Sequence, residues 1–271
     1  MAGEPKAEFF MTFLPRAFLY YIVLALAAPL PAQAQQPSLL AQIDTAKAAI
    51  VTVLAENDDL FQSRPAIAGI DKKHGRIMLT KKIAQASYQR SGAGVIIDPS
   101  GIIVTNAHIV TRAKHIKVTL TDGQQVEAQI VFAAEQEDIA LLQIQPPHAL
   151  KAVSLADSDQ IHLRDEIISI GNSPLLNQTV SGGKVIGLGR SRSGKVNDQT
   201  NKLIQTTITL YSGDSGGPLF DRQGRLIGLM TAKETSSDRS SFAVPANKIA
   251  QHLIDYRTKK SKMQNHEQPH R

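Results

Sequence analysis

Residues 212–219 read SGDSGGPL, in which a serine lies among glycines and a proline opens an apolar segment. Acyl-transfer chemistry favours this arrangement, because the nucleophile must stand clear of the backbone and nearby N–H groups must point at a developing oxyanion. Gly213 allows a turn in which its own N–H and that of Ser215 converge, and Gly216 and Gly217 leave room for a substrate chain. A glycine-rich turn with an incidental serine is the alternative interpretation.

A serine hydroxyl is a weak nucleophile without a base. Among the eight histidines, His108 follows the apolar stretch Ile102–Val104 on a turn of small residues, where its ring can face a cleft. The base in turn needs a carboxylate that fixes its tautomer and stabilises its cation. Asp138 leads directly into the apolar run 139–144, a costly place for an unpaired charge. Judged singly, His108 also fits a structural role and Asp138 an ordinary surface position.

Most of the chain from residue 94 onward consists of short apolar segments separated by turn signals. We expect strands at 94–97, 102–105, 115–120, 126–131, 139–144, 166–170, 179–188, 202–207, 218–220, 226–231 and 241–244. Many short strands without alternating helices predict an all-β sandwich or barrels rather than β-α units.

Helices are expected only at the two ends of this strand region. Residues 39–49 are expected to form a short helix before a first strand at 49–54, and 56–90 a polar loop. A terminal helix is predicted from the spacing of Ile249, Leu253 and Tyr256, with Asn247 as its cap.

The start of the chain predicts export. Residues 18–30 read FLYYIVLALAAPL after Arg16 and end at the small-x-small site AQA, residues 32–34. This order is typical of a cleavable secretory signal, and the run is short for a membrane-spanning helix. We therefore expect residues 1–34 to be a signal peptide, with Met11 as an alternative start, and an uncleaved anchor as the other interpretation.

Composition limits the function classes. The 271 residues carry a formal charge of +6, with 42% hydrophobic residues and no cysteine, so disulfides and thiolate metal sites are excluded. The sequence contains no basic stripe with interleaved aromatic residues, so a nucleic-acid partner is not expected. Residues 189–196, GRSRSGKV, nearly fit a phosphate-binding loop, but Val196 stands where a magnesium ligand is required. We expect an exposed basic loop there.

Three stretches in order, TNAHIV (105–110), DIALL (138–142) and GDSGGPL (213–219), resemble the His, Asp and Ser boxes of trypsin-like serine proteases. The flanking segments SGAGVIIDPSGIIVTNAHIV, DEIISIGNSPLLNQTVSGGKVIGLGRS and SFAVPANKI are similar to the bacterial HtrA/Deg branch of that family. The resemblance covers roughly residues 40–256. It implies two six-stranded antiparallel β-barrels with a catalytic triad between them, followed by a C-terminal helix.

The same resemblance implies domain limits and roles. The first barrel, with its leading helix and loop, would occupy 35–155, the second barrel and terminal helix 156–257, and a polar tail 258–271. His108 would be the base, Asp138 its orienting acid and Ser215 the nucleophile. The backbone of Gly213, Asp214 and Ser215 would form the oxyanion hole. Asp214 departs from the asparagine usual in this branch.

The pocket for the residue before the cut would be lined by Thr209, Leu210, Tyr211 and Ser241. A shallow pocket of this composition is expected to accept Val, Ala, Thr or Leu and to reject basic and large aromatic side chains. HtrA proteins usually carry PDZ domains after the protease, and we expect none here.

These observations predict an exported, periplasmic or secreted serine endopeptidase that acts on unfolded or extended proteins and peptides. No metal or organic cofactor, nucleic acid or lasting membrane span is expected, and the oligomeric state stays open. One alternative is a non-catalytic, chaperone-like binding protein on the same fold. Another is an esterase, but these usually place serine before the acid and histidine on a parallel α/β sheet.

Overall fold

The computed structural model of the chain describes residues 39–57, 65–71, 76–81, 88–173, 177–190, 202–233 and 240–266, which all belong to one unit of the chain, 38–271. The expected signal peptide, 1–34, and most of the basic loop, 189–196, lie outside these ranges. Across the part of the chain that is described, no helix is long and apolar enough to cross a membrane.

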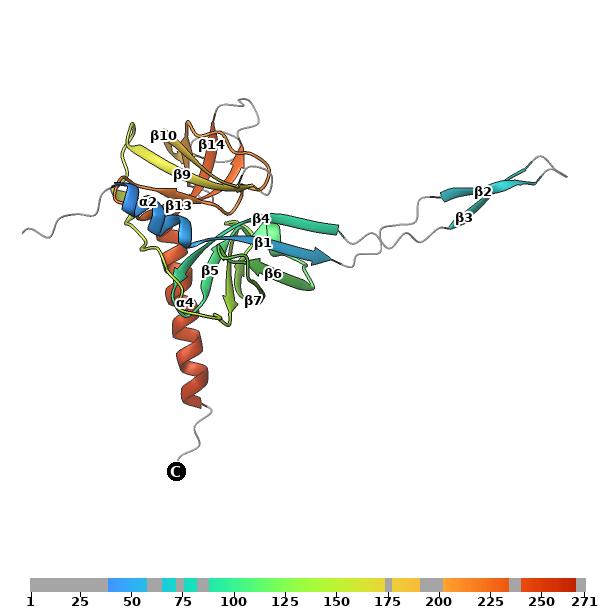
Figure 1. Cartoon of the computed structure of the whole chain (residues 1–271), viewed down its shortest axis with the longest axis horizontal. Helices are drawn as coiled ribbons and strands as arrows, with labels where there is room; N and C mark the ends of the chain where they lie inside the picture. The colour runs from blue at the N-terminus through green and yellow to red at the C-terminus, as the bar shows by residue number, and fades with distance from the viewer. Residues whose placement is uncertain are drawn as a thin grey trace, which may run out of the picture. The chain divides into compact units, whose positions relative to one another are not determined.

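Six strands close the first barrel in the order β1-β4-β5-β8-β7-β6, and every neighbouring pair is antiparallel (Figure 1). They are β1 (Ile50–Asn57), β4 (Tyr88–Asp98), β5 (Ile102–Thr105), β6 (His115–Thr119), β7 (Gln125–Ala134) and β8 (Ile139–Ile144). Two helices adjoin this barrel: α2 (Leu39–Ala48) leads into β1, and the single turn α3 (Ala107–Val110) follows β5. Closure leaves no unpaired strand edge in the barrel.

The second barrel closes in the order β10-β11-β14-β13-β12-β9, again antiparallel. Its strands are β9 (Glu166–Ser173), β10 (Asn177–Arg190), β11 (Leu203–Thr206), β12 (Pro218–Phe220), β13 (Leu226–Lys233) and β14 (Ser241–Pro245), and the short helix η1 (Ser158–Gln160) precedes them. The predicted all-β fold of two six-stranded barrels with a C-terminal helix is confirmed.

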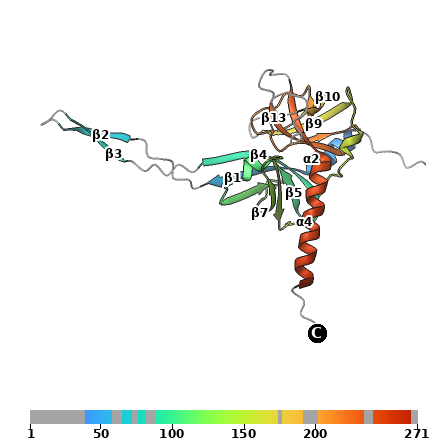
Figure 2. The same ribbon diagram turned by 180° about the vertical axis from the view of Figure 1, so that it is seen from behind.

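The terminal helix α4 (Ala246–His266) packs against β7, β13 and β14 (Figure 2). Ile249 and Leu253 are buried in the core and Tyr256 packs on its edge, so the predicted apolar face is confirmed. The predicted cap is wrong. The helix already includes Asn247. The side-chain oxygen of Asn247 accepts the Ser158 N–H at 3.1 Å, so a distant partner uses the group that would otherwise cap the helix. The helix also continues beyond 257 into the expected tail.

The segment 56–90 was predicted to be a loop, and this was wrong. It holds the end of β1, the hairpin strands β2 (Pro65–Asp71) and β3 (Arg76–Lys81), and the start of β4. Among the described residues β2 and β3 pair only with each other. Packing against a barrel core therefore does not constrain the sequences of β2 and β3. They lack the alternation of apolar and polar residues that indicates a barrel strand.

A shared core joins the two barrels. Aliphatic residues of the first barrel form one continuous cluster with Phe220 and Phe242 of the second, two of the largest fully buried side chains. Polar contacts also cross the junction, including a 2.8 Å bond from Asn172 Nδ2 to Thr52 Oγ1. Because the cores and the polar contacts are continuous, residues from both barrels can be held in fixed register at this junction.

Candidate active site

His108 lies on the single helical turn α3, which directly follows the end of β5. Its neighbours Ala107, Ile109 and Val110 are buried and fix the turn in the core. The side chain of His108 is 46% exposed. The apolar neighbours thus anchor the backbone while the imidazole is presented at the surface.

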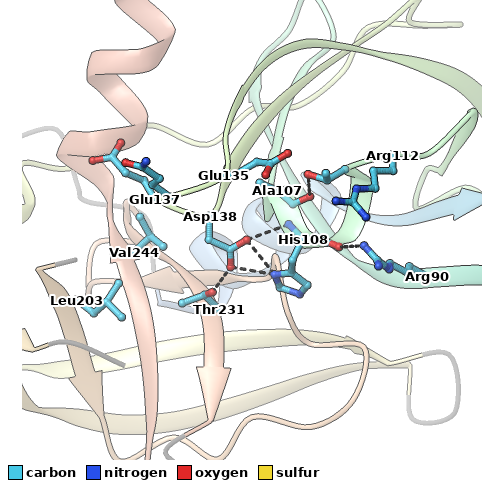
Figure 3. Close-up of a pocket in the computed structure, with 12 residues that line it drawn as sticks. Arg90, Ala107, His108, Arg112, Glu135, Glu137, Asp138, Leu203, Thr231 and Val244 are labelled. Carbon is cyan, nitrogen blue, oxygen red and sulfur yellow. Dashed lines mark hydrogen bonds and ion pairs between the residues drawn. The ribbon is translucent and has the colours of Figure 1, made fainter. Parts of the chain in front are cut away.

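Asp138 stands immediately before β8, with its side chain only 13% exposed and a left-handed backbone, φ +58°. Each of its carboxylate oxygens lies 2.9 Å from His108 Nδ1, and Oδ1 also accepts the His108 backbone N–H at 3.0 Å (Figure 3). Burial by itself would raise the pKa of Asp138, but the side-chain hydrogen bonds from His108 and Thr231 outweigh it and lower this pKa. Asp138 is therefore a carboxylate that orients and supports the imidazole.

Thr231 is a site residue that the sequence analysis missed. It lies on β13 of the second barrel, is almost fully buried, and its hydroxyl donates to Asp138 Oδ2 (Figure 3). Its strand is otherwise apolar and buried up to the exposed Lys233. A single threonine within an apolar strand is the sequence signal that could have identified Thr231, since a buried hydroxyl needs a hydrogen-bond partner.

Ser215 and His108 line the same open cleft, which has a volume of about 540 Å³. The cleft is bordered by Gln89, Arg90, Ser91, His108, Ile109, Ser212, Gly213 and Ser215. Within the described residues the Ser215 hydroxyl makes no hydrogen bond to the imidazole; such bonds are often long until a substrate is bound. The structure thus brings the three predicted triad residues from both barrels to one junction.

The loop before Ser215 leaves two backbone donors available. Gly213 and Gly216 both have left-handed backbones, with φ +96° and +82°. The N–H groups of Asp214, Gly216 and Gly217 bond to backbone carbonyls, whereas those of Gly213 and Ser215 donate to no described residue. The sequence analysis assigned the backbone of Gly213, Asp214 and Ser215 to an oxyanion hole. The N–H groups of Gly213 and Ser215 are available for this role, whereas the N–H of Asp214 donates to the Tyr211 carbonyl at 3.1 Å.

Asp214 is held by backbone amides. Its Oδ2 accepts the Tyr211 N–H at 3.1 Å, and the Asn172 N–H of β9 is a second donor. Burial raises the pKa of Asp214, and these two backbone hydrogen bonds only partly oppose the effect. The carboxylate packs so closely on β9 that a Cβ at Gly171 would lie 2.4 Å from Oδ1. Through these contacts Asp214 ties the loop before Ser215 to β9.

The predicted substrate-pocket residues separate into two groups. Thr209, Leu210 and Tyr211 border a cavity of about 40 Å³ together with Asp214 and other residues of the second barrel. Ser241 does not border it: its side chain is fully buried, and its hydroxyl donates to the Ile208 carbonyl at 2.6 Å. Residues 234–239, which precede β14, lie outside the described ranges.

A third cavity, of about 280 Å³, lies on the Asp138 side of His108, and Figure 3 shows its lining. Arg90 borders this cavity and the open cleft beside Ser215, and it donates to the His108 carbonyl at 2.7 Å. Glu137, next to Asp138, forms ion pairs with Lys248 at 3.0 Å and with His252 on α4. Glu137 was not identified from the sequence, because its ion-pair partners lie more than a hundred residues away in the chain.

A family model described as a trypsin-like peptidase domain matches residues 92–229, about half of the chain, and this range includes His108, Asp138 and Ser215. The chain belongs to the trypsin-like peptidase family. The resemblance to trypsin-like proteases predicted from the sequence is thereby confirmed.

Relatives of this trypsin-like peptidase include bacterial proteases of the HtrA/Deg branch. The periplasmic pH-dependent serine endoprotease DegQ of Escherichia coli K12 is 36% identical over 231 residues, which is 83% of this chain and 50% of DegQ. The periplasmic serine endoprotease DegP of Salmonella typhimurium is 41% identical over 169 residues, 61% of this chain and 35% of DegP. The chain thus spans half or less of the length of these relatives.

A solved structure is also similar. The HtrA-type protease AlgW, determined with a tripeptide, aligns with a TM-score of 0.62 at 28% identity, over 81% of this chain and 64% of AlgW. The chain therefore shares the fold of this HtrA-type protease.

Proposed function

We propose that this chain is a serine endopeptidase that hydrolyses peptide bonds in unfolded or extended proteins. The observation that carries the proposal is the pairing of His108 with the buried carboxylate of Asp138 at 2.9 Å, beside the cleft that Ser215 also lines. An imidazole oriented in this way is a general base for a serine hydroxyl. The similarity to serine endoproteases of the HtrA/Deg branch supports the same assignment.

In the proposed mechanism Ser215 Oγ attacks the scissile carbonyl while His108 Nε2 accepts its proton. The imidazolium that forms is stabilised by Asp138 through Nδ1–H, and the oxyanion binds the N–H groups of Gly213 and Ser215. His108 then gives the proton to the leaving amine, which breaks the peptide bond and leaves an acyl group on Ser215. Water attacks this ester with the same base and restores the free serine.

For specificity we propose a broad preference for Val, Ala, Thr or Leu before the cut. The cavity at Thr209–Tyr211 has room for only a few water-sized groups, which disfavours long basic and large aromatic side chains. The Asp214 carboxylate borders this cavity, but it already accepts backbone amides. A change of one methylene alters such binding by only about 1–3 kcal/mol, so the preference is expected to be graded.

The proposed location is the periplasm or the exterior of the cell. The apolar run 18–30 and the AQA site at 32–34 support export, and the relatives DegQ and DegP are named as periplasmic enzymes. The partners in this proposal are protein and peptide substrates.

Proteomic cleavage profiling tests the proposed function. The purified protein and its Ser215→Ala variant are incubated with the same unfolded protein mixture, and new termini are identified by mass spectrometry. We expect cuts after small and branched aliphatic residues with the parent and none with the variant. If the parent binds unfolded proteins and leaves them uncut, the chaperone-like alternative replaces the proposal. If cuts follow mainly Arg or Lys, the triad stands and the pocket assignment fails.

A further inference from the structure

Asn106 is a fully buried residue with an unusual set of contacts beside the site. It precedes α3, at the position where an asparagine side chain commonly caps a helix, yet it makes no capping hydrogen bond. Its Nδ2 donates instead to the backbone carbonyl of Asp138, 3.0 Å away and 32 residues along the chain. Its Oδ1 is buried and has no partner among the described residues.

This arrangement costs stability at two points. A buried acceptor without a partner is destabilising. The residue that Asn106 holds, Asp138, has a left-handed backbone, which is uncommon for any residue other than glycine. Strained and unsatisfied groups that adjoin one another in a native structure are often found where a site requires a fixed geometry.

Asp138 is consequently held on two sides by one short segment. Asn106 binds its backbone carbonyl, and His108, two residues later, binds its carboxylate through both the backbone N–H and Nδ1. The first contact fixes the carbonyl of the peptide that joins Asp138 to β8, and without it we expect the carboxylate to be placed less precisely against His108 Nδ1. The Nδ1 bond and the Thr231 bond depend on the same carboxylate position.

We propose that Asn106 is a positioning residue of the proposed protease site, which acts by clamping the Asp138 backbone so that the carboxylate faces His108. The proposal rests on the proposed function for its effect on turnover. It adds a residue that touches neither the substrate nor the reacting atoms and that acts only through Asp138.

Two substitutions and one control test the proposal. Asn106→Leu keeps the approximate shape and removes both the donor and the unpartnered oxygen, and Asn106→Ala removes the side chain without risk of overpacking. The control is Gln143→Ala, which also deletes a side-chain amide that donates to backbone carbonyls, those of Ser100 and Ile144. Each protein is assayed for kcat and KM on a peptide substrate and for its melting temperature.

A readout that needs no turnover accompanies the assay. The proton on His108 Nδ1, in its bond to Asp138, gives a downfield proton NMR signal when histidine is labelled with nitrogen-15. It is recorded for each protein in a Ser215→Ala background, where hydrolysis is absent.

We expect both Asn106 variants to lose about tenfold to a hundredfold in kcat, with KM within about twofold, because a small misplacement of a catalytic group has effects of this size. The Nδ1 proton signal should shift or broaden in both variants, and the melting temperature of Asn106→Leu should stay near or above that of the parent. Gln143→Ala should change only the melting temperature.

The proposal is overturned if Asn106→Leu keeps the parental kcat and Nδ1 signal, or if kcat in the three variants simply follows melting temperature. A parent that folds but shows no Ser215-dependent turnover contradicts the proposed function instead. In that case a displaced Nδ1 signal in the Asn106 variants still supports the clamp, and an unchanged signal rejects it.

Discussion

The backbone N–H of Ala93 donates to the carbonyl of Ser215 at 2.8 Å, across the junction between β4 of the first barrel and the loop that precedes β12 of the second. The carbonyl of Ala93 in turn accepts the hydroxyl of Thr105, at the end of the strand that leads to His108, at 2.7 Å. One strand of the first barrel thus contacts both the serine loop and the histidine strand. These contacts explain how His108 and Ser215, which lie more than a hundred positions apart in the chain, are held at fixed positions relative to each other.

The close approach at this junction predicts a severe effect of Gly216→Ala. A Cβ at Gly216 would lie 2.1 Å from the Ala93 carbonyl oxygen, and the backbone there has φ +82°. The loop must therefore shift, and we expect activity to fall by at least a hundredfold in a peptide assay. Gly182→Ala is the matched control, because its Cβ meets open space. Equal activity in the two variants would contradict the proposed role of this contact.

Removal of the Thr231 hydroxyl should impair catalysis without unfolding the protein. Thr231→Val keeps the shape of the side chain but deletes the donor to Asp138 Oδ2, and the pKa of Asp138 should then rise. A hydrogen bond to a charged group contributes about 1.5–3 kcal/mol, so a loss of about tenfold or more in kcat/KM is expected. Thr231→Ser keeps the hydroxyl and should retain most of the activity. If Val and Ser at this position behave alike, the hydroxyl has no part in the reaction.

Sequence reasoning reached the features that are local in the chain and missed those that depend on distant partners. The glycines around Ser215 and the apolar runs before His108 and after Asp138 are contiguous signals, and they indicated both the fold and the candidate triad. Thr231 was missed because its partner, Asp138, lies 93 residues earlier in the chain. Asn106 was missed because its partner, the backbone carbonyl of Asp138, lies 32 residues along the chain.

The same contrast explains two of the errors in the predicted secondary structure. Asn247 stands where the sequence predicts a helix cap, but its side-chain oxygen accepts the backbone N–H of Ser158, 89 residues away. The hairpin β2–β3 pairs with no barrel strand among the described residues, so no buried face imposed a period on its sequence. Competition from tertiary partners decides such positions, and a single sequence does not reveal it.

Asp214 should make stability depend on pH in a defined direction. Its folded-state pKa is raised by burial, so its stabilising contribution is fully present below the unfolded pKa, near 3.8, and is lost as pH rises through the folded pKa. Asp214→Asn does not titrate. The melting temperature of this variant relative to the parent should therefore increase from about pH 4 to pH 7. A difference that stays constant over this range would contradict the raised pKa.

The ion pairs between Glu137 and α4 should contribute more to the free energy of unfolding than an ordinary surface ion pair does. Glu137 is 30% exposed, and its partners Lys248 and His252 are 22% and 17% exposed. We expect Glu137→Gln to lower the free energy of unfolding by about 1–2 kcal/mol, measured by urea denaturation at pH 7. Glu166→Gln, which breaks a far more exposed pair with Arg222, should cost less than about 0.5 kcal/mol.

The effect of Glu137 should fade at acid pH. Burial opposes the shift, but hydrogen bonds from His252 and Lys248 lower the pKa of Glu137 below its ordinary value of 4.5. A lowered folded-state pKa gives stability that is present above the unfolded pKa and lost as pH falls through the folded pKa. The difference in the free energy of unfolding between the parent and Glu137→Gln should therefore become smaller below about pH 4.5. A gap that widens on acidification would count against these ion pairs.

Active-site labelling tests the central claim most directly. The folded protein is treated with a fluorophosphonate, which reacts with a serine only when a base activates it, and the adduct is located by peptide mass spectrometry. We predict a single adduct on Ser215, absent from Ser215→Ala and formed at least a thousandfold more slowly in His108→Ala and Asp138→Asn. A folded parent that is not labelled, or a label that persists in Ser215→Ala, would contradict the assignment of this site.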